Sequence, residues 1–202
     1  MRAVLSIAKY TIKEHVRSRI YMVVLIFGLI LLLAGIIFSS LAMEQRQRVL
    51  VNLGFASVEF LALLIMLLSA SHLILEEMES RTLYLILSRP VHRLHYIGGR
   101  FLGMVASVAL AVLIMGSMNL LFLMLFGVPW HTQYIFSLFF SLLKVILAGS
   151  MGLFFSIVSS SPVTAISFTG VVWILGHFST ELEYLIQKAG NLISKNIMLL
   201  FY

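Results

Sequence analysis

Residues 20–42 read IYMVVLIFGLILLLAGIIFSSLA and contain no charged side chain. A helix of about 20 mostly apolar residues crosses the roughly 30 Å hydrocarbon core of a bilayer. Open strands are excluded there, because their backbone N–H and C=O groups would have no partners in hydrocarbon. This stretch therefore predicts a transmembrane helix from Ile20 to Ala42.

The remainder of the chain has the same character. Of its 202 residues, 61% are hydrophobic and 11% are charged, and the mean hydropathy is +1.06. Soluble domains have about half apolar and a quarter charged residues. Four further apolar stretches are candidate spans: Leu53 to Leu75, Phe101 to Val128, Tyr134 to Val158, and the shorter Pro162 to Phe178. We predict one all-α integral membrane domain over 1–202, with five transmembrane helices.

Composition also limits the chemistry. The chain has no cysteine, which excludes disulfides and thiolate metal sites. The net charge of +6 comes from residues near the ends of the spans, so it does not indicate a nucleic-acid groove. No catalytic, cofactor-binding or metal site is predicted, and no G-x-x-x-x-G-K-[ST] phosphate loop occurs.

The positions of lysine and arginine predict the orientation, because cytoplasmic loops carry an excess of these residues. One side of the membrane would hold Arg2, Lys9, Lys13, Arg17, Arg19, Arg81, Arg89, Arg93 and Arg100. The other side would hold Arg46, Arg48, Lys188 and Lys195. We therefore expect a multi-pass protein of a bacterial or archaeal inner membrane, with a cytoplasmic N-terminus.

Residues 1–19 predict a separate amphipathic helix. Leu5, Ala8, Ile12 and Val16 recur at helical spacing, and Lys9, Lys13 and Arg17 form a basic stripe on another face. Such a helix lies in the headgroup layer beside anionic lipids. The alternative is a basic segment that only directs membrane insertion.

The most informative segment is the cytoplasmic connection 76–100. Its acidic cluster Glu76-Glu77-Met78-Glu79 is followed by a short apolar run that ends at Arg89, because the residue before a proline avoids the α region. Pro90 suits the first turn of a new helix. We name this segment the elbow and expect it to be a charged docking surface with an apolar centre.

Three groups of residues carry a resemblance to a known family: Glu77-x-Glu79-x-Arg81-Thr82-Leu83, Leu87-Ser88-Arg89-Pro90-Val91-x-Arg93, and Gly99-Arg100-Phe101-Leu102-Gly103. This pattern resembles ABC-2 type transporter permeases, most closely the subgroup of multicopper-enzyme maturation systems. The segment from Ile7 to Arg19 is similar to the elbow helix that precedes the first span in that family. Many members have Gly-Thr where this chain has Arg81-Thr82.

The resemblance implies a transporter subunit that hydrolyses no ATP itself. A second permease subunit, as a homodimer, and a cytoplasmic ABC ATPase dimer would be its partners, within membrane lipid and without nucleic acid. ATP and Mg²⁺ would be bound by the ATPases. The implied ATPase-docking residues are Glu77, Glu79, Arg81, Thr82, Leu83, Ile86 and Arg93. An exporter is expected; a membrane scaffold that recruits a cytoplasmic protein without transport is the alternative.

Polar residues within spans are costly and tend to have a function. Glu59 and Lys144 lie at similar depths in spans that run in the same direction, so they could pair, or each could be solvated separately. Gly99-x-x-x-Gly103 and Ala148-x-x-x-Gly152 are spacings that allow close approach of helices.

The end of the chain predicts one more surface helix. Thr180-Glu181-Leu182-Glu183 matches a capping box, and apolar and polar residues then separate onto two faces over 179–202. We expect an amphipathic helix on the outer surface, followed beyond Tyr202 by a sixth span that returns the chain to the cytoplasm.

Overall fold

The computed structural model describes residues 2–41, 45–79, 93–128, 132–159, 161–178 and 188, with the backbone alone for 2, 3, 72–79, 93 and 94. Every element in these ranges is helical. The labelled helices are α1 (Arg2–Arg17), α2 (Arg19–Leu41), α3 (Arg46–Glu79), α5 (Arg93–Leu125) and α6 (Gln133–Val158). A shorter apolar helix, Pro162–Phe178, follows α6. The predicted all-helical membrane bundle is confirmed.

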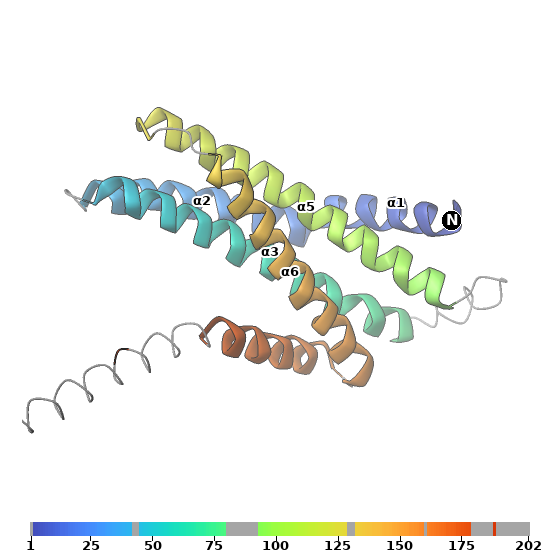
Figure 1. Cartoon of the computed structure of the whole chain (residues 1–202). Helices are drawn as coiled ribbons and strands as arrows, with labels where there is room; N and C mark the ends of the chain where they lie inside the picture. The colour runs from blue at the N-terminus through green and yellow to red at the C-terminus, as the bar shows by residue number, and fades with distance from the viewer. Residues whose placement is uncertain are drawn as a thin grey trace, which may run out of the picture.

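Four of these helices, α2, α3, α5 and α6, are long and apolar enough to cross a bilayer. They alternate in direction along the chain (Figure 1). The Pro162–Phe178 helix turns back against α6, but its 17 residues rise only about 25 Å. Four of the five expected spans are therefore full length, and the described part of the fifth is shorter than the roughly 30 Å hydrocarbon core.

The ends of the helices have local causes. Ser18 separates α1 from α2, and its hydroxyl oxygen accepts a hydrogen bond from the Tyr21 N–H at 3.1 Å, as an N-cap residue does. At the end of α5, Gly127 has a φ of 74°. The Gly127 and Val128 N–H groups donate to the carbonyls of Met124 and Leu123, which is the glycine-terminated Schellman motif.

These end signals correct two predicted boundaries. The span expected to run from Phe101 to Val128 ends at Leu125, because Gly127 leaves the helical conformation. The segment expected to be one helix over 1–19 ends at Arg17 and restarts at Arg19, because Ser18 caps the following helix. The outer helix predicted over 179–202 lies outside the described residues, apart from Lys188.

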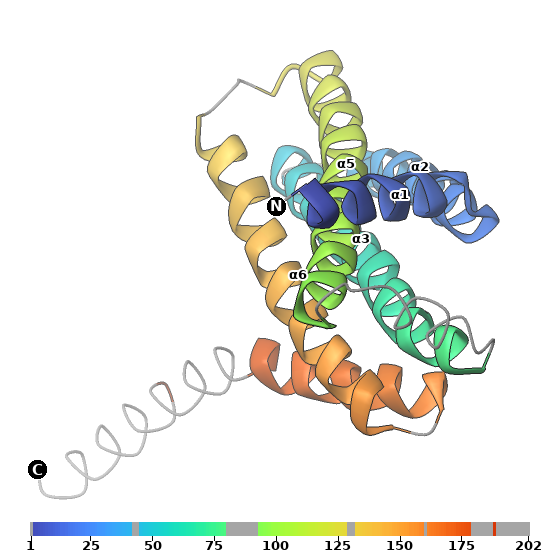
Figure 2. The same ribbon diagram turned by 90° about the vertical axis from the view of Figure 1, so that its right-hand side faces the viewer.

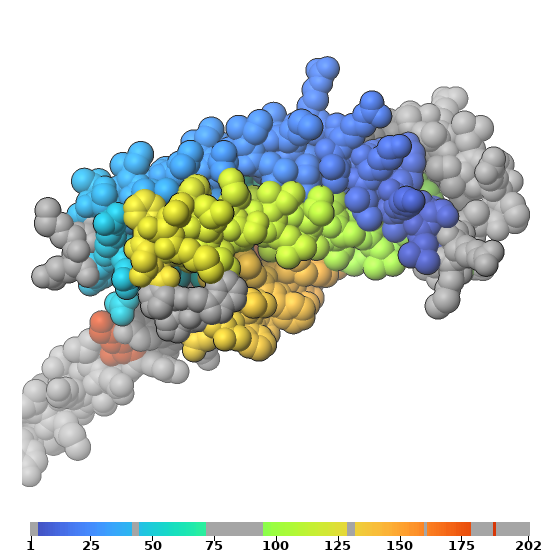
Figure 3. Space-filling view, turned by 90° about the horizontal axis from the view of Figure 1, so that it is seen from above, coloured from blue at the N-terminus to red at the C-terminus, as the bar shows by residue number. Residues whose placement is uncertain are grey.

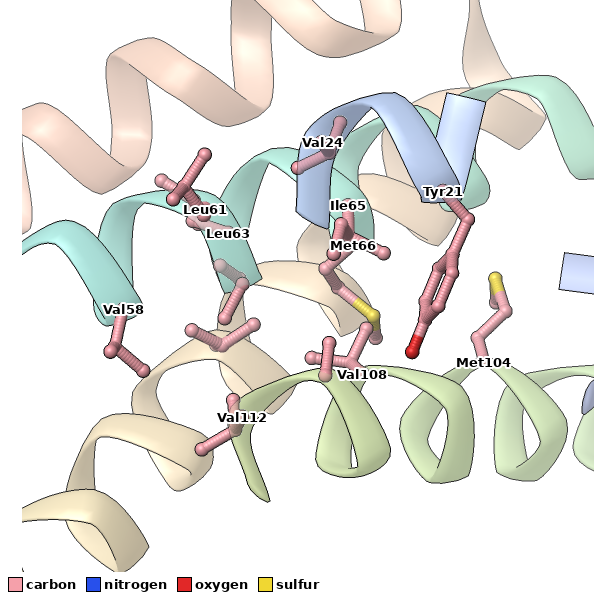
Figure 4. Packing of buried hydrophobic residues seen from close by; sticks show 14 of the residues in the cluster. Tyr21, Val24, Val58, Leu61, Leu63, Ile65, Met66, Met104, Val108 and Val112 are labelled. Carbon is pink, nitrogen blue, oxygen red and sulfur yellow. The ribbon is translucent and has the colours of Figure 1, made fainter. Parts of the chain in front are cut away.

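The core lies between α2, α3, α5 and α6. In Figure 4 the ring of Tyr21 points from α2 toward α5, beside Met66 and Met104. Its hydroxyl donates to the Ser107 carbonyl at 2.9 Å. Val58, Leu61, Met66, Met104, Val108 and Val145 are among the residues with almost no exposed surface. This packing holds the long helices in a fixed relation to one another.

Helix α1 lies across the first half of α5 at one end of the bundle (Figure 2). The space-filling view shows α1 directly against α5, with α2 continuing along the same face (Figure 3). The last residues of α3 and the first residues of α5 belong to the same end (Figure 1). We call this the α1 end of the bundle.

Candidate functional site

The α1 end brings together the two helices that flank the elbow. Glu77 and Glu79 belong to the last turns of α3, and Arg93 begins α5; their side chains are outside the described part of the structure. Arg81, Thr82, Leu83 and Ile86 lie outside the described residues altogether. Their predicted docking role stays a prediction.

Both flanking helices are longer than a bilayer requires. Helix α3 has 34 residues and α5 has 33, which correspond to roughly 50 Å each. A hydrocarbon core of roughly 30 Å leaves about 20 Å of each helix outside. The charged residues at the end of α3 and the start of α5 indicate that much of this excess lies at the α1 end. The elbow is thus joined to the bundle by two continuous helices.

Helix α1 is packed closely against α5 at two glycines. A Cβ atom added at Gly99 would lie 3.0 Å from the Val4 carbonyl oxygen, and one at Gly103 would lie 2.9 Å from the Ala8 carbonyl oxygen. Backbones approach this closely only where no side chain stands between them. The structure therefore places both glycines of the Gly99-x-x-x-Gly103 pattern in the α1–α5 interface.

The face of α1 that packs on α5 differs in part from the predicted apolar stripe. Ala8 and Thr11 are buried, whereas Leu5 is 70% exposed. Lys9 and Lys13 are exposed, as a basic outer stripe requires. Thr11 is polar and is not one of the residues of the predicted apolar stripe. Its hydroxyl donates a hydrogen bond to the Ile7 carbonyl at 3.0 Å, so the buried hydroxyl has a partner.

Arg100 anchors α1 to α5. Its Nη1 lies 2.5 Å from Glu14 Oε2, and its side chain is only 11% exposed. Its Nε donates to the Tyr96 hydroxyl at 3.2 Å, and the guanidinium lies over the rings of Tyr10 and Tyr96. The Glu14 side chain is 45% exposed, so solvent screens the pair from one side and its contribution to stability is modest. The sequence placed Arg100 among the cytoplasmic cations and in the Gly99-Arg100-Phe101-Leu102-Gly103 motif, but gave no sign of its contact with α1.

A second polar contact between α1 and α5 joins His15 to Ser107. His15 Nδ1 is 3.1 Å from Ser107 Oγ, and the Ser107 hydroxyl also reaches the Met104 carbonyl at 2.8 Å. Burial lowers the pKa of His15; Glu14 raises that pKa and Arg100 lowers it. Burial has the largest of these three effects, so the pKa is lowered and the imidazole is neutral at neutral pH. Sequence reasoning missed this contact, because its partners are far apart along the chain.

Within the membrane, Glu59 of α3 meets two residues of α6. Its Oε1 lies 3.4 Å from Lys144 Nζ, and its Oε2 accepts a hydrogen bond from Ser141 at 3.0 Å. The Glu59 side chain is 16% exposed and that of Lys144 is 56% exposed. The structure thus brings together the two intramembrane charges that the sequence singled out. Ser141 was missed, although it precedes Lys144 by one helical turn.

Glu59 also lines an open groove of about 930 Å³. The groove lies between α3 and the Pro162–Phe178 helix, with one residue from α2. Its lining residues are Leu31, Asn52, Leu53, Phe55, Ala56, Ser57, Glu59, Phe60, Trp173 and His177.

Small residues also bring α3 and α6 together. Ala148 is 7% exposed, and a Cβ atom added at Gly152 would lie 3.3 Å from the Ala70 Cβ. The tightest site is Gly149, which was not predicted: an added Cβ there would overlap the Met66 side chain. The Ala148-x-x-x-Gly152 pattern thus lies in this interface, and Gly149, next to Ala148, lies against the Met66 side chain.

Comparison with known proteins agrees with the helical arrangement. A family model described as ABC-2 family transporter protein matches residues 5–182. The match begins in α1 and includes every longer helix described above. A search of curated proteins found no match. The family match does not separate the subgroup of multicopper-enzyme maturation permeases, which stays a prediction.

Proposed function

The chain belongs to the ABC-2 family of transporter proteins and is a membrane permease subunit of an ABC transporter, and from this premise we propose that it is one half of a homodimeric exporter. Permeases of this family work with cytoplasmic ATPase partners. In this proposal, ATP and Mg²⁺ bind to a separate ATPase dimer, which docks on the elbow. The family match over residues 5–182 is the observation that carries the proposal.

The long extensions of α3 and α5 support a coupling role for the elbow. A partner that pushes on the elbow would move both helices, because each is continuous from the elbow into the core. Helix α1 would move with α5, since Arg100 and the two glycines hold them together. ATP-driven closure of the ATPases would thus rearrange the bundle and open a path for substrate.

The distribution of cations supports a cytoplasmic N-terminus in the inner membrane. At the α1 end, Lys9, Lys13, Arg17 and Arg19 are exposed. At the opposite end, the start of α3 carries two exposed cations, Arg46 and Arg48. Lysine and arginine favour the cytoplasmic side, so we place the α1 end in the cytoplasm, where the ATPases are.

Cysteine labelling tests this orientation directly, because the chain has no native cysteine. Single cysteines at Gln47 and Thr132, which are exposed at the end opposite α1, should react with a membrane-impermeant maleimide in intact cells. A cysteine at Ser6, exposed on α1, should react only after lysis. The reverse pattern of labelling would contradict the orientation.

The proposed function is tested by expressing the chain with a candidate ATPase subunit, for example one encoded beside it. The two proteins should co-purify, and the complex in lipid nanodiscs should hydrolyse ATP at a rate that a transported substrate changes. Lipids, peptides and saccharides are the substrates to screen. An ATPase that neither associates nor responds would favour a scaffold over a transporter.

A further inference from the structure

The contact between α3 and α5 contains a buried amide group that lacks a hydrogen bond. Asn119 of α5 is 2% exposed, and its Nδ2 has no hydrogen-bond partner among the residues that the structure describes. A Cβ atom added at Gly54 of α3 would lie 2.7 Å from Asn119 Cγ. The amide therefore occupies the space that the missing side chain of Gly54 leaves, directly against the α3 backbone.

The other buried polar side chains in the described ranges all have partners. They are Thr11, Ser39, Ser71, Ser107, Ser141, Ser156 and Thr169, and each of their hydroxyls donates a hydrogen bond. Most of them donate to a carbonyl three or four residues earlier in the same helix, as serine and threonine do. Asn119 is the exception. Its amide gives up water on burial and gains no hydrogen bond for Nδ2 in return, which raises the free energy of the closed contact.

Apolar residues cover this amide on the side of the nearer membrane surface. Leu50 lies one helical turn before Gly54 on α3, and Leu123 lies one turn after Asn119 on α5. Both leucines are 6% exposed and belong to one apolar cluster. Asn119 is six residues from the end of α5 at Leu125, a rise of roughly 9 Å. While the leucines are packed, they separate the amide from water at the end of the bundle opposite α1.

We propose that Asn119 favours the separation of α3 from α5 at this end, and that the separation is a step of the transport cycle. When Leu50 and Leu123 part, water reaches the amide and accepts its hydrogen bonds. The leucines oppose this step, because parting exposes their apolar surface. The inference rests on the proposed function, in which this end is the outer side where an exporter releases its substrate.

An apolar residue at position 119 would remove the reason to open. Leucine has the same branched shape as asparagine but no donor, so the closed contact would no longer contain an unpaired polar group. Replacing an unpaired buried polar group by an apolar one of similar shape is neutral or stabilising. Asn119→Leu should therefore shift the balance toward the closed contact.

The test measures how fast a cysteine inside the contact reacts with a reagent from water. The parent is the purified chain in lipid nanodiscs with Leu123→Cys, which carries a single thiol because the chain has no native cysteine. A positively charged methanethiosulfonate reagent reaches this buried position when the helices part. The rate follows the population of the opened form when closing is faster than the reaction. Adding Asn119→Leu should slow the reaction about tenfold, which corresponds to roughly 1.4 kcal/mol.

A second variant guards against a poor fit of leucine. Asn119→Met is also apolar, and its flexible side chain adapts to irregular spaces, so it should slow the reaction as well. If either folded variant reacts as fast as the parent, the proposal fails. A water held permanently by the amide would make both variants react faster, because the closed contact would lose that hydrogen bond, and this result would also overturn the proposal.

Two controls make the measurement specific. Ser117 is exposed on the same helix and its hydroxyl donates to the Ile114 carbonyl, so Ser117→Ala should leave the reaction at Leu123→Cys unchanged. An equal slowing by Ser117→Ala would show that the amide is not the cause. Gln47→Cys, at an exposed position, should react equally fast with and without Asn119→Leu; a difference there would mean that the variant changes more than this contact and would overturn the proposal. The assay contains no ATPase, so its outcome is independent of whether the ATPase associates.

Discussion

Reversing the charges of Glu77, Glu79, Arg81 and Arg93 together should abolish stable binding of the partner ATPase. Truncating one member of a buried, hydrogen-bonded charge pair at an interface costs about 2–5 kcal/mol, which weakens binding roughly 30-fold or more. Reversal replaces attraction by repulsion at four positions, so the loss should be larger. Co-purification of a tagged permease with the ATPase measures the effect, and ATP hydrolysis by the reconstituted complex measures coupling.

The reversal does not change the number of cations on that side of the membrane, because two acidic and two basic residues are exchanged. The topology should therefore be unaffected. The matched control is Arg46→Glu with Arg48→Glu, which reverses exposed charges at the opposite end of the bundle and should leave ATPase binding unchanged. If the elbow variant still binds the ATPase and transports normally, the ATPases dock elsewhere.

Replacing Gly103 by alanine should destabilise the α1–α5 interface. The added Cβ would lie 2.9 Å from the Ala8 carbonyl oxygen and 2.5 Å from the Thr11 Cβ, so the two helices must move apart. Overpacking of this kind costs about 1–3 kcal/mol. The melting temperature of the purified protein should fall by roughly 2–12 °C. Hydrogen exchange should increase at the backbone amides of α1.

Gly98→Ala is the matched control for this experiment. It lies on the same helix, and a Cβ atom added there has no neighbour within 4 Å among the described atoms. Alanine is a better helix former than glycine by about 0.5–1 kcal/mol. The control should therefore raise stability slightly or leave it unchanged. Equal losses in both variants would show that α1 is not held by close packing at Gly103.

The spans were predictable because they depend on local composition. Lipid accepts apolar side chains on every face, so a long uncharged run such as residues 20–42 indicates a helix without knowledge of its neighbours. The end of α5 was harder to place. Gly127 was visible in the sequence, but an apolar run continues past it to Val128, and only the backbone conformation shows that the helix ends at Leu125.

The candidate sites were predictable to different degrees. Glu59 and Lys144 are conspicuous because charges are rare within spans. Ser141, which completes their contact, looks like any serine in a membrane helix. Arg100 and Glu14 are 86 positions apart, and no local pattern connects them. The groove is formed by residues from three helices, so its existence depends on how those helices pack.

The sequence by itself determined that this protein is a helical membrane bundle of the ABC-2 type, since apolar length and the elbow motif are properties of consecutive residues. Only the tertiary structure decided that α1 is joined to α5 through Arg100 and Gly103, and that Glu59 and Trp173 line the same groove. The physical reason is that lipid solvates every apolar face of a membrane helix equally well. Hydrophobicity therefore leaves open which faces meet, and close packing and rare polar contacts decide it.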